Sequence, residues 1–211
     1  MKPRSVRAAA SFLAVTAVLL AACSSLDTEI AAEDGNPSWL ETWQPAEFSD
    51  PGRVHVEAGT LVLEAGRDLT GARWRDMPAR MNYEIRLEAM RVEGDDFFCG
   101  LTFPVNDAPC TLIVGGWHGG TVGLSSLDYE DAASNDTTQY MTFENGRWYR
   151  IRLRVTAKRI QAWIDGQSLI DVSIEGRVVG IRHEMEPSRP LGIASWRTTA
   201  AIRNIVFEPL E

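Results

Sequence analysis

A glycine-rich segment, residues 115–120, is the part of the chain best suited to chemistry. Four of its six residues are glycine, so its backbone bends freely, and it presents the indole of Trp117 and the imidazole of His118. An indole can stack on the apolar face of a sugar ring. An imidazole titrates near neutral pH and can act as a general base or as a hydrogen-bond donor. The alternative is a loop in which Trp117 packs over a sheet edge and His118 is simply exposed.

Carboxylates are the other groups that could act on a bound molecule. We consider Glu84 and Asp96, together with His118, as candidate catalytic residues. A catalytic cleft would need at least two convergent polar groups. The other residues that could provide such groups are Glu88, His183 and Glu184.

An acidic loop over residues 127–131, continued by Asn135 and Asp136, raises the question of a bound calcium ion, and so do Asp95 and Asp96. The loop lacks the spacing of an EF-hand, and acidic loops are common in a chain this acidic. We therefore predict a solvated loop and no metal or other cofactor, with calcium as the alternative.

These residues must be positioned by strands, and residues 147–172 show the clearest pattern. Apolar residues from Tyr149 to Val155 alternate with three arginines, which is the period of a strand with one buried and one wet face. A second strand follows, and the pair Asp165-Gly166 predicts a tight turn into a third. On the second strand, alternation turns Trp163 to the wet face, where Arg152 or Arg154 can stack against it.

A strand with alternating charges over residues 83–89 is predicted to lie beside the arginine strand. That pairing would set Glu84 and Glu88 against the arginines as a ladder of opposite charges on a solvated face. An anion-binding site is the alternative.

The whole of residues 38–211 is long enough for one domain with a sizeable core. Its apolar runs are short, separated by Gly, Pro, Asn and Asp, and none keeps a helical period over a dozen residues. The sequence therefore predicts an all-β fold, an antiparallel two-sheet jelly-roll sandwich.

The amino terminus has the features of an export signal. Three basic residues precede an uncharged run over residues 8–22, which ends in a Leu-Ala-Ala-Cys sequence like that of a bacterial lipobox. We predict that residues 1–22 are a lipoprotein signal peptide, that Cys23 is acylated, and that residues 23–37 are a flexible tether. The protein would then be an exported lipoprotein of the cell envelope, and Ser24 after the cysteine indicates the outer membrane. An ordinary signal peptide with a coincidental cysteine is the alternative.

The net charge of the chain indicates which kinds of partner to expect, and its cysteines indicate a disulfide. Without residues 1–22 the chain has 18 Lys and Arg against 29 Asp and Glu, a net charge of −11, so nucleic acid is not expected as a partner and the lipid anchor is the expected membrane contact. Cys99 and Cys110 remain once Cys23 carries lipid. In an exported chain they predict a disulfide across a hairpin, with two buried thiols as the alternative.

The segments around residues 146–149 and 163–166, together with 59–61, 83–88 and 202–205, resemble the 3-keto-disaccharide hydrolase-like domains of the concanavalin A-like lectin/glucanase superfamily. The resemblance implies a jelly-roll fold and a hydrolase or lyase activity on a modified disaccharide or glycoside. The E-x-D-x-E motif of family-16 glycoside hydrolases, which share the general fold, does not occur in the sequence.

Three functions therefore remain open: a glycoside-directed enzyme, a lectin-like binding module, and a structural surface lipoprotein. Carbohydrate is the expected ligand of the first two. For a binding site we predict one groove that has Trp163 as its floor, with Trp117 and Trp196 at its border and with Arg152 and Arg154 as hydrogen-bond donors.

Overall fold

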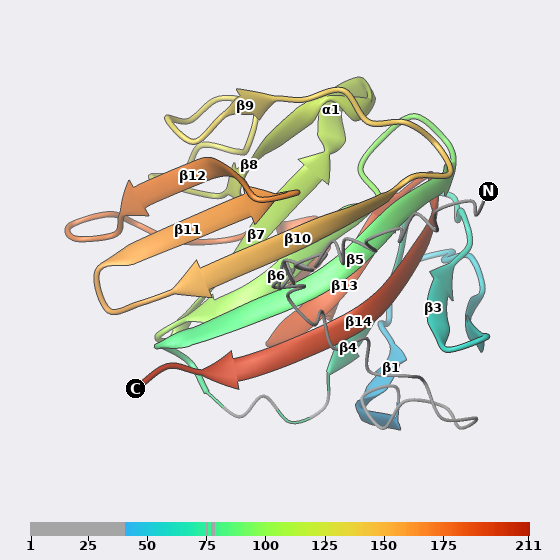
Figure 1. Ribbon diagram of the computed structural model, residues 1–211, viewed down its shortest axis with the longest axis horizontal. Coiled ribbons are helices and arrows are strands. Elements are labelled where there is room, and N and C mark those ends of the chain that lie inside the picture. The colour runs from blue at the N-terminus through green and yellow to red at the C-terminus, as the bar shows by residue number, and fades with distance from the viewer. Residues whose placement is uncertain (1–40, 75, 77–78) are drawn as a thin grey trace, which may run out of the picture. The chain divides into compact units, whose positions relative to one another are not determined.

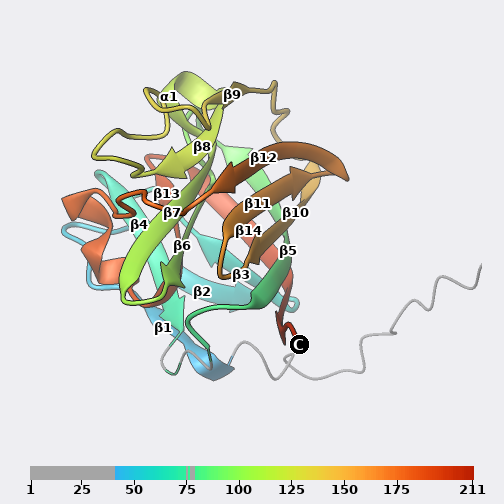
Figure 2. The same ribbon diagram turned by 90° about the vertical axis from the view of Figure 1, so that its left-hand side faces the viewer.

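The computed structural model describes residues 41–74, 76 and 79–211, and these residues form two antiparallel seven-stranded sheets packed face to face (Figures 1 and 2). The predicted all-β jelly-roll sandwich is therefore confirmed. The predictions for the signal peptide, for Cys23 and for the tether concern residues that lie outside this described part.

The first sheet, called sheet 1, has the strand order β1-β4-β13-β6-β7-β8-β9. Its strands are β1 (Trp43–Pro45), β4 (Leu69–Trp74), β13 (Leu191–Trp196), β6 (Cys99–Val105), β7 (Ala108–Gly115), β8 (Thr121–Ser125) and β9 (Gln139–Tyr140).

The second sheet, called sheet 2, has the order β12-β11-β10-β5-β14-β3-β2. Its strands are β12 (Gln167–Ser173), β11 (Arg159–Ile164), β10 (Trp148–Val155), β5 (Tyr83–Glu93), β14 (Thr199–Pro209), β3 (Thr60–Leu63) and β2 (Val54–Glu57).

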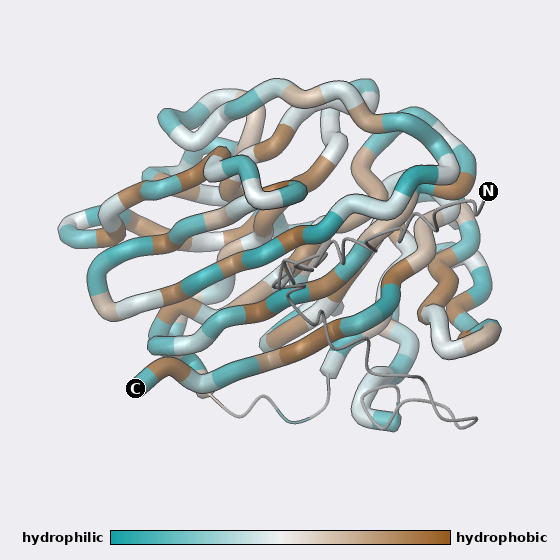
Figure 3. Tube along the Cα trace, viewed as in Figure 1, coloured by the Kyte–Doolittle hydropathy of each residue, from teal (hydrophilic) through white to brown (hydrophobic). Residues whose placement is uncertain are grey.

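The main hydrophobic core lies between the inner faces of the two sheets. Along β5 and β10, hydrophobic residues alternate with hydrophilic ones (Figure 3), as expected for strands with one face on the core and one in water. In β10 the apolar residues from Tyr149 to Val155 are buried, while the arginines between them face outward. The periodicity of the sequence thus determines which face of sheet 2 is wet.

The predicted meander is confirmed by the register of β10 with β11 and of β11 with β12. The turn between β11 and β12 has positive φ at Asp165 (49°) and Gly166 (83°), as the Asp-Gly pair predicts. Strands β1 and β4 were not predicted. In β4 the residues between Leu69 and Trp74 are Thr, Gly, Ala and Arg, which carry little apolar alternation.

The predicted disulfide is wrong: Cys99 and Cys110 are both free and buried. They lie on the neighbouring strands β6 and β7, but Cys99 pairs with Val114, whereas Cys110 pairs with Phe103. Four residues along a strand correspond to roughly 13 Å, and a disulfide needs Cα atoms within about 7 Å. The hairpin turns at Asn106, which is closer in sequence to Cys110 than to Cys99, so the register separates the two thiols.

Helical structure among the described residues is short: it comprises α1 (Gly116–Gly119), the 3₁₀ turn η2 (His183–Ser188) and 3₁₀ residues at 41–42. No helix in this part of the chain is long and apolar enough to cross a membrane.

Candidate functional site

A row of small residues runs across the outer face of sheet 1. Directly paired positions on five neighbouring strands carry Gly71, Ala194, Gly100, Ile113 and Gly123, in the order β4, β13, β6, β7, β8. Because four of these five side chains are a hydrogen atom or a methyl group, other side chains can lie flat against the sheet. A Cβ atom at Gly100, for example, would be 2.9 Å from the ring of Phe97.

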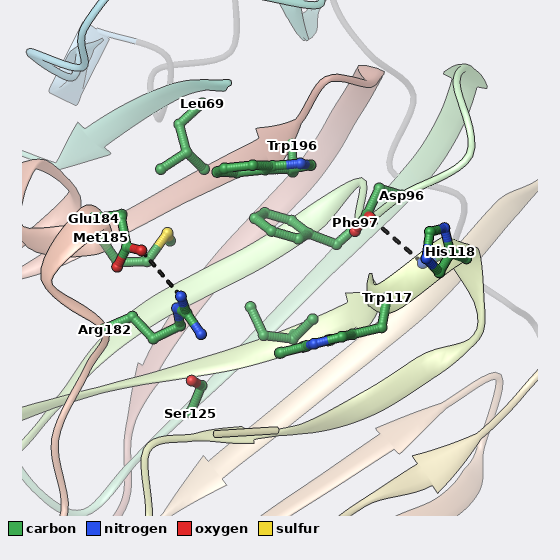
Figure 4. Close-up of a pocket in the computed structure, with 11 residues that line it drawn as sticks. Leu69, Asp96, Phe97, Trp117, His118, Ser125, Arg182, Glu184, Met185 and Trp196 are labelled. Atoms are coloured by element: carbon green, nitrogen blue, oxygen red, sulfur yellow. Dashed lines mark hydrogen bonds and ion pairs between the residues drawn. The ribbon is translucent and has the colours of Figure 1, made fainter. Parts of the chain in front are cut away.

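A second hydrophobic cluster covers this face and includes Leu69, Phe97, Ile113 and Met185, with Trp196 packed against it. Within the cluster is an open pocket of about 230 Å³ (Figure 4). The residues that line it are Leu69, Asp96, Phe97, Ile113, Trp117, His118, Ser125, Arg182, Glu184, Met185 and Trp196.

The two tryptophans of the pocket come from different elements. Trp196 is the last residue of β13, and Trp117 lies in the α1 turn between β7 and β8. Their indole rings lie on opposite sides of the pocket, with Phe97 between them (Figure 4). Trp117 keeps 38% of its surface exposed. The pocket therefore presents two flat aromatic walls to an entering molecule.

The turn that carries Trp117 is left-handed. Positive φ angles occur at Gly115 (80°), Trp117 (46°), His118 (66°) and Gly119 (92°). In this region a residue with a Cβ atom costs roughly 1 to 2 kcal/mol. The two residues that present side chains to the pocket are thus the strained ones, and such strain is characteristic of binding and catalytic sites.

Two side chains hold this turn in place. Asp96 accepts hydrogen bonds from the backbone N–H of Phe97 (2.7 Å) and of His118 (3.4 Å). The buried guanidinium of Arg91 donates to the carbonyl oxygens of Phe143 (2.6 Å) and Gly119 (3.5 Å). The carboxylate and the guanidinium thereby tie the turn to the neighbouring connections.

The opposite end of the pocket is charged. Arg182 donates to the carboxylates of Glu184 (3.0 Å) and Asp131 (3.2 Å). The hydrogen bond from Arg182 lowers the pKa of Glu184, and the same bond raises the pKa of Arg182. Glu184 is therefore held as a carboxylate that can accept hydrogen bonds from a ligand's hydroxyl groups.

Ser125, at the end of β8, contributes a buried hydroxyl group to the pocket lining. The residue is 1% exposed, and its Oγ has no hydrogen-bond partner among the described residues. A buried hydroxyl without a partner costs roughly 1 to 3 kcal/mol. A ligand or a water molecule in the pocket could remove that cost.

The structure brings together part of the set of residues singled out from the sequence. Trp117, His118, Asp96, Trp196 and Glu184 all line the pocket, although they come from four separate segments. His183 begins the same 3₁₀ turn as Glu184 but is exposed and does not line the pocket.

The remaining residues of that set lie on the outer face of sheet 2. Trp163 is there, directly opposite Arg152 on β10, and the guanidinium of Arg152 lies 3.8 Å from the centre of its ring. Arg154 lies 5.9 Å from the same ring and bonds to Glu84. The stacking follows the prediction, and so do the pairs of Glu84 with Arg154 and of Glu88 with Arg150, whereas Arg152 pairs with Arg86 and interrupts the ladder of opposite charges. The single groove shared by three tryptophans does not follow the prediction, because Trp163 is on a different sheet from Trp117 and Trp196.

Arg182, Ser125, Met185 and Phe97 were not foreseen as site residues. For Phe97 a signal existed, because Phe97 and Phe98 are consecutive and two neighbours entering a strand face opposite sides of the sheet. Phe98 enters the main core and Phe97 the outer cluster. For Arg182 and Met185 the sequence offers no periodic signal, since Arg182 precedes and Met185 lies within the short 3₁₀ turn η2.

The acidic loop considered for calcium faces arginines. Arg177 lies within ion-pair distance of Asp128 (2.6 Å) and of Asp136 (2.9 Å), and Asp131 faces Arg182. Within residues 41–74, 76 and 79–211, no group of three or more His, Cys, Asp or Glu residues could hold a metal ion.

The described residues thus form a jelly-roll sandwich with an aromatic-walled pocket on one outer face. The chain belongs to the 3-keto-alpha-glucoside-1,2-lyase-like domain family, whose model matches residues 34–208. The resemblance read from the sequence is thereby confirmed. No curated protein matches the chain.

Solved structures with the same fold share little sequence with this chain. The carbohydrate-binding module CBM66 from Bacillus subtilis has a TM-score of 0.52 at 12% identity, over 79% of this chain and 95% of that one. Domain 4 of AbnA, an extracellular arabinanase from Geobacillus stearothermophilus, in complex with arabinotriose, has a TM-score of 0.52 at 13% identity, over 79% and 82%. A sialidase gives 0.56 at 13% identity, over 81% of this chain but 17% of the sialidase.

Proposed function

We propose that this domain binds a saccharide in the pocket between Trp117 and Trp196. The observation that carries the proposal is the placement of two indole rings on opposite sides of one pocket, one from strand β13 and one from the α1 turn. The C–H faces of a sugar ring pack against indoles, and its hydroxyl groups need hydrogen-bond partners at the ring's edge. Glu184, Arg182 and Ser125 provide such partners at one end, and Asp96 and His118 provide them at the other.

The pocket volume of about 230 Å³ is just below the range of about 300 to 1,000 Å³ for sites that enclose drug-sized ligands. One or two sugar rings therefore fit better than a long oligosaccharide enclosed along its length. Membership of a carbohydrate-related family supports the choice of ligand class.

The test is binding of full-length protein to a glycan array, followed by calorimetry with the best ligand. We expect Trp117→Ala to weaken binding about fivefold, since loss of one stacking partner removes on the order of 1 kcal/mol. Trp117 is partly exposed, so the variant should fold. Trp163→Ala is the matched control, because it removes an indole from the other sheet. Loss of binding in Trp163→Ala, with unchanged binding in Trp117→Ala, would refute the pocket as the site.

A second candidate function is the elimination named in the family's description, and the observation that favours it is His118, held in a strained conformation beside the aromatic wall. In a 3-keto glucoside the ketone acidifies the hydrogen on C2. A base that removes this proton lets its electron pair form the C1–C2 double bond, while the glycosidic oxygen leaves C1 and takes up a proton. His118 would be the base.

Incubation with a 3-keto disaccharide separates the two functions. Catalysis predicts an enone product and release of the second sugar, and both should be lost in His118→Ala while the substrate still binds. Binding of the disaccharide without any turnover would leave the domain a binding module.

A further inference from the structure

The outer face of sheet 2 carries a second hollow, on the opposite side of the sandwich from the pocket described above. Its volume is about 330 Å³, and it lies over β5, β10 and β11, which face the viewer in Figure 1. Its charged lining residues are Arg86, Arg150, Arg152 and Glu88, and Trp163 forms its aromatic part. Three arginines and one glutamate give it positive charge in a chain whose net charge is −8.

The cross-strand register places like charges side by side. Arg152 on β10 pairs directly with Arg86 on β5, an arrangement that is unfavourable unless an anion lies nearby. The buried Glu84 already bonds to Arg154 at 2.9 Å and to Arg86 at 3.4 Å, and Arg86 has a second carboxylate partner in Glu208. The distance from Glu84 to Arg152 is 4.0 Å, too long for a hydrogen bond. Arg152 is therefore the guanidinium that this carboxylate does not satisfy.

Among the described residues, the side chain of Arg150 also has no carboxylate within hydrogen-bonding distance. Its side chain is 77% exposed, and its nearest carboxylate, Asp165, lies 4.0 Å away and is hydrogen-bonded to Arg147 at 2.9 Å. Glu88, on the rim of the hollow, is hydrogen-bonded to Arg203 at 2.6 Å. In the described part of the chain, no carboxylate lies within hydrogen-bonding distance of the side chains of Arg150 or Arg152.

Arg152 is nonetheless held in place. Its guanidinium stacks on the Trp163 ring at 3.8 Å, which fixes its plane and leaves its N–H groups free to donate at the edge. Arg150 is two residues away on the same strand, on the same face and roughly 7 Å distant. Two guanidinium groups at that spacing can donate to one oxyanion between them.

We propose that this hollow is an oxyanion-binding site, in which Arg150 and Arg152 bind a carboxylate or phosphate group such as an acidic glycan carries. The site does not depend on the proposed function of the pocket, since the two lie on different sheets.

The test is a titration of the full-length protein, observed through the arginine Nε–H signals in ¹H–¹⁵N spectra. The probes are inorganic phosphate and glucuronate, with glucose as the neutral control and chloride at matched ionic strength. Variants Arg150→Gln and Arg152→Gln assign the two signals. We expect phosphate and glucuronate to shift these two signals and glucose to shift neither. Shifts from glucuronate but not from phosphate would show that the bound anion must be a carboxylate carried by a sugar.

Each variant should weaken anion binding by about tenfold, the effect of losing one hydrogen bond to a charged group. Arg159→Gln is the matched control, because Arg159 lies on the same sheet but is already bonded to Asp171 at 2.5 Å, and its affinity should equal that of the wild type. The proposal is overturned if chloride reproduces the shifts, or if Arg159→Gln weakens binding as much as Arg150→Gln does.

Discussion

Burial decides the chemistry of the two cysteines. Cys99 and Cys110 lie in the main core, and desolvation raises the pKa of each thiol to about 12. Because the thiolate is the reactive form, both should be inert in the folded protein.

We predict that neither thiol is alkylated by iodoacetamide under native conditions at pH 8, and that both react after unfolding without reductant. A Cys23→Ser background leaves these two as the chain's cysteines, and intact mass counts the adducts. Absence of adducts after unfolding would mean that a disulfide forms after all.

The ion pairs of Arg177 predict a dependence of stability on pH. A hydrogen bond from Arg177 lowers the pKa of Asp136 below its ordinary value of 3.8. The folded state thus holds this proton less tightly than the unfolded chain does. The ionised carboxylate stabilises the fold above the unfolded pKa, and this contribution is lost as pH falls through the lower folded pKa.

We therefore expect the melting temperature of the wild type to fall more between about pH 5 and pH 2 than that of Arg177→Gln or Asp136→Asn. Thermal unfolding followed by circular dichroism measures the difference. Parallel curves for all three proteins would contradict this account.

At the scale of elements, the left-handed turn α1 combines backbone strain with close packing. At Gly119 the φ angle is +92°, and an added Cβ atom would lie 2.7 Å from Nη1 of Arg91 and 2.8 Å from the carbonyl oxygen of Asp95. Gly146 also has positive φ, +79°, but a Cβ atom there would have no neighbour within 4 Å.

This contrast gives a matched pair of variants. Gly146→Ala should lower the free energy of unfolding by roughly 1 to 2 kcal/mol, from the backbone alone. Gly119→Ala should lose a further 1 to 3 kcal/mol, roughly, from overpacking, and should also weaken saccharide binding because Trp117 is displaced. Urea unfolding measures the stabilities, and equal losses in the two variants would show that packing around Gly119 is unimportant.

At the scale of the whole molecule, the two outer faces of the sandwich differ in chemistry. Sheet 1 carries small residues, a hydrophobic cluster and an aromatic-walled pocket, whereas sheet 2 carries a ladder of arginines and glutamates. The first face suits a sugar ring, and the second suits an anionic group. Variants on one face should leave binding at the other unchanged.

The attachment of the molecule to a membrane is still a prediction from the sequence, because Cys23 lies outside the described residues. We expect full-length protein made in a bacterium to be found in the membrane fraction, with the intact mass of a chain that begins at an acylated Cys23. Cys23→Ala should abolish both results. A mature chain that begins at another residue, without lipid, would refute the prediction.

The sequence by itself determined the meander of β10, β11 and β12, the neighbouring position of β5, and the family. Period-two alternation specifies which residues of β5, β10 and β11 face the core, and the same alternation puts Trp163, Glu84 and the arginines on the wet face. The register of the strands then chose Arg152 as the partner of Trp163 and Arg154 as the partner of Glu84. Local chemistry, in the Asp-Gly turn, also determined the tight connection between β11 and β12, whereas a bulge between Ala162 and Trp163 shifts the register beyond the turn. These features depend on neighbours in sequence or on one pairing of strands.

The tertiary structure alone decided which residues share a site. The pocket is assembled from β4, β7, β8 and β13, from the connection before β6, from α1, and from η2 with the preceding Arg182, and no periodicity relates these segments. For the same reason the sequence did not show that Trp163 lies apart from Trp117 and Trp196. Alternation predicts that an indole is on an outer face but not on which sheet. The distance between Cys99 and Cys110 was also decided by the tertiary structure, since the position of the hairpin turn, not the spacing of the cysteines, sets the register.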